Sequence, residues 1–319
     1  PAAALGHLAL GAAWLPLLVW ASVVTTERLA LSSPRPGAGP TRKATRPASL
    51  RTGPLRWLPS GPVGAVAART LVTKVRTPRQ SVNTLTALLV GAGVVLVGPI
   101  LDAGSPDPRL VMIGGLLHFA VLFDGNNAYG MDGPAIWTEV ASGADATVLT
   151  RGKLLASLVV MAVPAAVVPV VLAVLTGGWE WLPAAWLIAA GSLGASAGVA
   201  VVGATLAPVA LPDSPNPLAA GDTGQGCVAG LMLAAGTLVL AVVTAPVAIV
   251  VGLASNRGPG VAAAASLLAV VVGALTLWAG DALARWRLAG REAELVQLPG
   301  QQRHHEPKGA AGYWGGASD

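Results

Sequence analysis

Acidic side chains that could take part in chemistry gather in one polar stretch of an otherwise apolar sequence. They are Asp124, Asp132, Glu139 and Asp145. An enzyme embedded in a membrane and acting on lipids would need acids or histidines clustered near one membrane interface, and carboxylates are common general acids and bases. These four residues are the candidates for such a role, so a lipid-modifying enzyme is one hypothesis for the chain.

The sequence lacks suitable residues for nucleotide hydrolysis and for metal binding. The phosphate-binding loop of nucleotide hydrolases reads G-x-x-x-x-G-K-[ST]. Gly152-Lys153 is followed by Leu154, and position 147 is a threonine, so this loop is missing and ATP would have to be hydrolysed on another chain. His304-His305 lies in a polar tail without a carboxylate or cysteine framework. The sequence therefore predicts no metal site and no cofactor held by the chain itself.

His118 is the one ionisable residue that falls well inside the long apolar stretches, away from their ends. Ionisable groups at mid-depth in a membrane are costly, and those retained often mark proton or ion routes. We interpret His118 as a group that hydrogen-bonds between packed helices, with a proton relay as the alternative. Because no Asp, Glu, Lys or Arg accompanies it at that depth, a proton-driven antiporter would lack its carrier.

The composition places these residues in a membrane protein. Of 319 residues, 54% are hydrophobic and 11% are charged, and the mean hydropathy is +0.66. Soluble domains carry about a quarter charged residues, so a soluble enzyme of this size is excluded. The apolar stretches lack period-2 alternation, which favours helices over a barrel. We expect an all-α, polytopic helix bundle.

Stretches long enough to cross a bilayer, at about 20 apolar residues each, number about seven. They are Leu8–Thr25, Leu85–Leu101, Leu110–Phe123, Leu154–Thr176, Ala184–Ala207, Cys227–Ala254 and Val261–Ala282. The third is the shortest, and it either continues through Asn126 and Asn127 or is re-entrant. In the fifth, Gly191, Gly194, Ala195 and Gly198 form a ridge of small residues that allows close helix contact.

The basic residues orient the bundle. If every stretch crosses, all of them except Arg109 and Arg257 fall on one side, and the positive-inside bias makes that side cytoplasmic. The prediction is a multi-pass protein of the bacterial plasma membrane with its C-terminus in the cytoplasm. Residues 1–28 would be the last helix of a preceding membrane half, 29–61 a basic Pro-rich linker, 62–285 a six-helix domain and 286–319 a cytoplasmic tail.

Residues 62–80 predict a basic amphipathic helix at the cytoplasmic interface, ended by Pro78. The alternative is a plain extension of the second span. We expect basic side chains here and before the fourth span to anchor the bundle at the interface with anionic lipids. These are Arg69, Lys74, Arg76, Arg79, Arg151 and Lys153. Nucleic-acid binding is not expected, because aromatic residues are scarcely interleaved with the charge.

The loop 124–153 predicts a turn at Gly130–Pro134 and then a short helix that Gly143 ends. Ile136, Trp137 and Val140 recur at helical spacing and would form an apolar face. A short helix presented from a cytosolic loop can dock a soluble partner. An ordinary interhelical loop would have the same periodicity, so the pattern alone leaves both interpretations open.

Two runs in this region are Asn126-Asn127-Ala128-Tyr129-Gly130-Met131-Asp132-Gly133-Pro134-Ala135-Ile136-Trp137 and, after it, Arg151-Gly152-Lys153-Leu154-Leu155-Ala156. Together they resemble the membrane subunits of ABC-2 type ABC transporters. In that family such a run opens a cytosolic coupling helix, and a Gly-Lys-x-x-Ala motif opens the next span. The basic helix that ends Arg76-Thr77-Pro78-Arg79 resembles the family's elbow helix. The resemblance covers about residues 60–285.

The resemblance implies a permease subunit of an ATP-driven exporter, not an enzyme itself. ATP and Mg²⁺ would bind a separate ATP-binding subunit, and a second transmembrane half or copy would complete the transporter. The residues that would dock the ATP-binding subunit are Asp132, Gly133, Pro134, Ile136, Trp137 and Val140. The apolar helices favour a lipophilic substrate. The alternative remains the lipid-modifying enzyme that uses the acids near the cytoplasmic interface.

Overall fold

The computed structural model describes residues 53–101, 107–209 and 226–295, and every regular element within them is a helix. The predicted first span Leu8–Thr25, the linker up to residue 52 and the tail from residue 296 lie outside the described residues. Within the described part the all-α prediction is confirmed.

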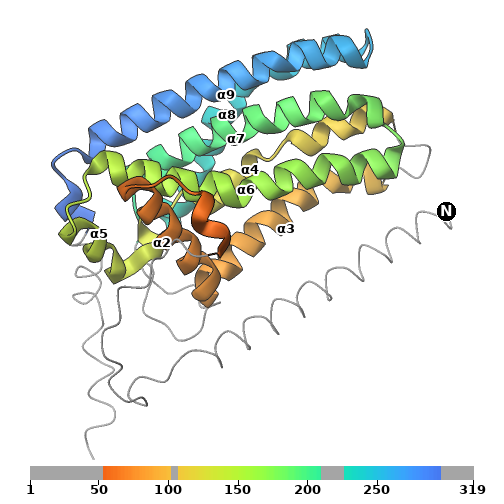
Figure 1. Ribbon diagram of the computed structural model, residues 1–319. Helices are drawn as coiled ribbons and strands as arrows, with labels where there is room; N and C mark the ends of the chain where they lie inside the picture. The colour runs from red at the N-terminus through yellow and green to blue at the C-terminus, as the bar shows by residue number, and fades with distance from the viewer. Residues whose placement is uncertain (1–52, 102–106, 210–225, 296–319) are drawn as a thin grey trace, which may run out of the picture.

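Figure 1 shows long helices side by side, with the short helices Pro62–Arg76 and Trp137–Ala141 at one end of the bundle. The α-helices are α2 (Pro62–Arg76), α3 (Pro78–Leu101), α4 (His118–Gly125), α5 (Trp137–Ala141), α6 (Ala146–Thr176), α7 (Leu182–Leu206), α8 (Gly226–Ser255) and α9 (Pro259–Leu288). Short 3-10 helices cover Gly53–Trp57, Pro108–Gly115, Gly130–Ile136 and Trp179–Trp181. The predicted break at Pro78 is confirmed, since α2 ends at Arg76 and α3 begins at Pro78.

Five described segments are long and apolar enough to cross a membrane: Pro108–Gly125, Ala146–Thr176, Trp179–Leu206, Cys227–Ser255 and Pro259–Leu288. They coincide with five of the predicted spans, and the predicted second span is helical within α3. Large apolar side chains on α6, α8 and α9 are exposed, among them Val163, Leu238 and Leu275. An apolar surface of this extent suits hydrocarbon rather than water, as expected for a membrane-embedded protein.

The third span is interrupted at Leu116 and Leu117, where the 3-10 helix Pro108–Gly115 gives way to α4. Close packing explains the break. A Cβ added at Gly115 would lie 2.5 Å from the carbonyl oxygen of Ala185 in α7. The Leu117 backbone N–H donates to the Ser192 hydroxyl, 2.9 Å away in α7. This side chain thus replaces the regular helical hydrogen-bond acceptor that the N–H lacks at the break.

The ridge of small residues predicted in the fifth span is a tight seam between α7 and α9. A Cβ at Gly194 would lie 2.7 Å from the Gly273 carbonyl oxygen, and one at Gly198 would lie 2.3 Å from that of Thr276. Measured from α9 toward α7, a Cβ at Gly280 would lie 2.2 Å from the Gly198 carbonyl oxygen. The two backbones therefore touch along several turns, as small-residue interfaces in membranes allow.

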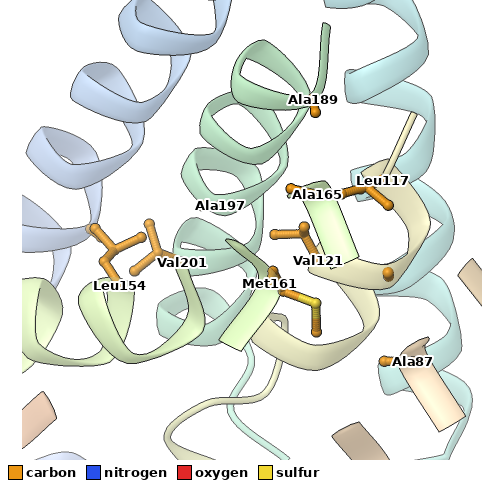
Figure 2. Packing of buried hydrophobic residues seen from close by; sticks show 11 residues of the cluster. Ala87, Leu117, Val121, Leu154, Met161, Ala165, Ala189, Ala197 and Val201 are labelled. Atoms are coloured by element: carbon orange, nitrogen blue, oxygen red, sulfur yellow. The ribbon is translucent and has the colours of Figure 1, made fainter. Parts of the chain in front are cut away.

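Larger side chains fill the centre of the bundle on the other side of α7. Figure 2 shows Leu117, just before α4, in one buried cluster with Val121 of α4, Met161 of α6 and Val201 of α7, with Ala87 of α3 at its edge. This cluster ties α3, α4, α6 and α7 together.

We predict that Gly194→Leu weakens the fold by about 1–3 kcal/mol or more, because the added side chain meets backbone rather than a movable side chain. The measurement is thermal unfolding of the purified chain in detergent. Gly230→Leu is the matched control, since Gly230 lies in α8 with nothing within 4 Å of an added Cβ. Equal melting temperatures for the two variants would contradict the seam.

Candidate functional site

The loop between α4 and α6 folds into a compact foot, by which we mean residues 130–143. The predicted turn is the 3-10 helix Gly130–Ile136, and the predicted short helix is α5. Gly143, with φ of +82°, ends α5 as expected, because few other residues adopt this conformation without strain. Asp145 then caps α6 by accepting a hydrogen bond from the Val148 N–H at 2.8 Å.

The foot has an inner and an outer side. Ile136 is 1% exposed and packs with Tyr129 and Leu149 in a buried cluster, to which Val140 adds a partly buried side chain. Trp137, the next residue, is 55% exposed and is not part of that cluster. The predicted apolar face is thus divided, with Ile136 buried against the bundle and Trp137 exposed within the described part of the chain.

A buried lysine of α6 holds the foot to the bundle. Lys153 is 1% exposed, and its Nζ binds the Asp132 carboxylate and lies 3.5 Å from Glu139 Oε2. Glu139 Oε1 in turn lies 2.6 Å from Arg69 Nη1 of α2. Two acids of the foot therefore pair with one cation from α6 and one from α2. Removing one partner of such a buried pair is strongly destabilising, because the other charge stays buried.

A second ion pair fixes the end of α4. Asp124 Oδ1 lies 2.6 Å from Lys74 Nζ of α2 and accepts a hydrogen bond from the Thr84 hydroxyl of α3 at 2.7 Å. The other oxygen, Oδ2, accepts from the Ser157 hydroxyl of α6 at 2.9 Å. The carboxylate thus joins four helices, and both of its oxygens are engaged.

The last turns of α9 complete this charged end. Asp281 Oδ2 lies 3.3 Å from Arg151 Nε of α6 and 3.1 Å from Arg285 Nη2. The Ala146 backbone N–H, at the start of α6, donates to Glu292 Oε1 at 3.1 Å. Leu295 packs in the same buried cluster as Ile136. The chain therefore packs on the foot as far as Leu295, beyond the predicted boundary at residue 285.

These pairs change the role expected for the basic residues. Arg69, Lys74, Arg151 and Lys153, predicted as anchors to lipid headgroups, are paired with acids of the chain. The Lys153 side chain is enclosed by protein, at 1% exposed. Arg76 is exposed at the end of α2, and Arg79 lies in the first turn of α3.

Helix α2 likewise uses its apolar face against protein. Ala67, Ala68 and Leu71 pack with Ala156 of α6 in a buried cluster, whereas Val75 is 63% exposed. The predicted segment is thus a helix with a buried apolar face, and that face packs on α6.

The Gly-Lys-x-x-Ala motif has a physical explanation in this contact. A Cβ at Gly152 would lie 2.5 Å from Val66 Cγ1, so glycine lets α2 cross α6 closely. Ala156, one turn on, is buried in the same interface. Lys153, between them, reaches the Thr70 hydroxyl of α2 at 3.2 Å as well as the acids of the foot. The motif therefore builds the junction of α2, α6 and the foot.

Asn127 and Tyr129 place the entry to the foot. Asn127 exchanges two hydrogen bonds with the Val209 backbone, at 2.8 and 2.9 Å, and so ties the foot to the end of α7. Burial raises the pKa of the Tyr129 phenol above its usual value, while a hydrogen bond with Thr150 lowers it by less. Tyr129 thus stays neutral under the foot.

His118 has the packing role expected for it. Its Nδ1 lies 2.8 Å from the Ser196 hydroxyl and 3.2 Å from the Ser192 hydroxyl, both on α7. The sequence pattern does not indicate these serines, nor that Asp281 and Ser157 belong to the charged end. These groups come from segments far apart in the sequence. Their helical spacing is the one sequence signal that could have indicated them.

Comparisons of the chain with family models, with characterised proteins and with solved structures find no match. The geometry of the foot and of the bundle is therefore the basis for the functional argument.

We predict that Lys153→Met lowers the free energy of unfolding by about 3–5 kcal/mol, since Asp132 would remain buried without its cation. The measurement is denaturant or thermal unfolding in detergent. The control is Arg76→Met, an exposed basic residue of α2, which we expect to change stability by no more than about 0.5 kcal/mol.

Adding Asp132→Asn to Lys153→Met should recover part of the lost stability, because Asp132 then no longer leaves an unpaired charge. Arg69 still pairs with Glu139 in that double variant. If Lys153→Met alone is as stable as Arg76→Met, the ion pair between Lys153 and Asp132 does not secure the foot.

Proposed function

We propose that the chain is the membrane-spanning permease subunit of an ATP-driven ABC exporter of the ABC-2 type. In this proposal the foot is the coupling element, and it docks on a separate ATP-binding subunit. The observation that carries the proposal is the exposed Trp137 on a foot that buried ion pairs join to α2 and α6. Exposed tryptophans are common anchors of protein–protein interfaces.

The ion pairs make the foot a suitable lever. A force on α5 reaches α6 through Lys153 and α2 through Arg69. Because separating either pair would leave a buried charge uncompensated, the foot, α2 and the first turns of α6 should move as one body. Closure of the partner on ATP would then tilt these helices, and the chain itself would need no nucleotide. ATP and Mg²⁺ belong to the partner, and a second transmembrane half or copy completes the transporter.

The distribution of charge supports the orientation of this proposal. The described basic residues lie at the end of the bundle that carries the foot, apart from Arg109 and Arg257 at the other end. The positive-inside bias then puts the foot in the cytoplasm of a bacterium, where ATP-binding subunits are found, with the bundle in the plasma membrane. The exposed apolar helices support a lipophilic substrate.

The pairing of the acids weighs against the lipid-modifying enzyme. A general acid or base needs a carboxylate that can reach a substrate. Asp124 is 2% exposed and is held by Lys74, Thr84 and Ser157, while Asp145 caps α6. Asp132 and Glu139 are committed to Lys153 and Arg69. These contacts suit carboxylates that hold helices together.

We predict that Trp137→Ala weakens association with the ATP-binding subunit encoded beside this chain by about thirty-fold or more, as expected for a central interface tryptophan. The two proteins are co-expressed, reconstituted in lipid nanodiscs and compared by affinity and by ATP hydrolysis. Trp286→Ala is the matched control, because Trp286 is also exposed, at 74%, and lies near the same end on α9.

Equal effects of the two tryptophan variants would refute docking through the foot. A purified chain that transforms lipids without any ATPase, and loses this activity on Asp124→Asn while remaining folded, would favour the enzyme instead.

A further inference from the structure

A cavity of about 320 Å³ lies in the half of the bundle away from the foot. It is bounded by the 3-10 helix Pro108–Gly115, α7, α8 and α9. Its walls are mainly apolar, with side chains such as Met112, Ile188, Val247 and Val251. The volume falls at the lower end of the roughly 300–1,000 Å³ typical of small-molecule sites. A single chain or compact ring system fits such a space better than a whole two-chain lipid.

The cavity is open at one side. Leu116, at the break in the third span, is 44% exposed, and Ala248 and Gly252 of α8 are exposed beside it. Because the helices that surround this mouth carry exposed apolar side chains, the mouth faces hydrocarbon when the bundle is in a membrane. An apolar molecule can therefore enter from the bilayer, whereas water gains few partners in an apolar cavity.

Polar groups meet the cavity at a few points. His118, Ser192 and Thr244 are among the residues that line it. The two serine hydroxyls engage Nδ1 of His118, and its Nε2 has no hydrogen-bond partner within the described ranges. Thr244 donates its hydroxyl hydrogen to the Leu240 carbonyl oxygen at 2.7 Å, so its own oxygen can still accept. One ring nitrogen and one hydroxyl oxygen thus remain for a ligand.

Charge limits what this cavity can hold. Among its described lining residues, His118 is the only side chain that can carry a charge. A charged ligand group placed there would lose its hydration without gaining a counter-ion, which is costly. A hydroxyl suits the site better, because it can accept a hydrogen bond from Nε2, or donate one to Nε2 or to Thr244.

We infer that this cavity binds a neutral, lipophilic molecule with a single hydroxyl group, of which the apolar part lies along α8 and the hydroxyl meets His118. The binding site does not depend on the proposed function. Its role as the place where an exporter takes up cargo rests on that function.

The test uses the full chain in lipid nanodiscs and a dodecanol that carries a photoactivatable diazirine in its chain. Labelling is mapped by mass spectrometry, and unlabelled dodecanol and dodecane are the competitors. We expect labels on α7 and α8 beside Ile188 and Val251, and competition by dodecanol that exceeds competition by dodecane. His118→Ala should weaken dodecanol binding about three- to ten-fold, the value of one neutral hydrogen bond, and leave the effect of dodecane unchanged.

Ala248→Trp should fill the cavity and reduce labelling there to background. Ile249→Trp is the matched control on the same helix, since Ile249 is 62% exposed and does not line the cavity. Labelling spread over the lipid-facing helices and unchanged by Ala248→Trp would overturn the site. Equal competition by dodecane would overturn recognition of the hydroxyl.

The two proposals can fail separately. A chain that binds dodecanol in the cavity and never associates with an ATPase keeps this site and refutes the exporter. A chain that couples to an ATPase through Trp137, yet shows no cavity labelling, keeps the exporter and refutes this site.

Discussion

Charge inside an apolar bundle must be paired, and this constraint organises the structure. Asp124 and Glu139 are buried at one end, and the Asp132 side chain there is 5% exposed, so each carboxylate would be costly without a cation. Each has one, from α2 or α6, at salt-bridge distance. The pairs need not add net stability relative to an apolar core. The pairs instead fix how the helices are positioned relative to one another, because few other arrangements leave no charge unpaired.

The two halves of the bundle differ as a result. At the charged end, ion pairs and side-chain hydrogen bonds join α2, α3, α4, α6 and the foot. In the other half, the contacts are mostly between small and apolar side chains, with the α7–α9 seam beside an open cavity. Such apolar contacts are weakly directional, so they tolerate rearrangement better than a fixed ion pair does. The charged end thus suits the transmission of a force and the far half suits the accommodation of a ligand.

Much of this could be predicted from sequence, and particular residues show where prediction ends. Span positions, the break at Pro78, the foot and the small-residue ridge follow from local periodicity and from glycine and proline. The position of Lys153 at the start of a span predicts a place at the membrane interface. Its burial depends on Asp132 and Glu139, which only the fold brings within reach. The same holds for the α9 side of the seam, where Gly273 and Gly280 gain meaning only beside α7.

Helix α4 connects the two halves. It has eight residues, or about 12 Å of rise, with His118 in its first turn and Asp124 in its last. Asp124 is fixed to α2 by Lys74, and His118 borders the cavity. The break at Leu116 and Leu117 separates α4 from the rest of its span. Force from α2 would therefore enter α4 at Asp124, while hydrogen bonds from His118 to Ser192 and Ser196 join the other end of the same short helix to α7 beside the cavity.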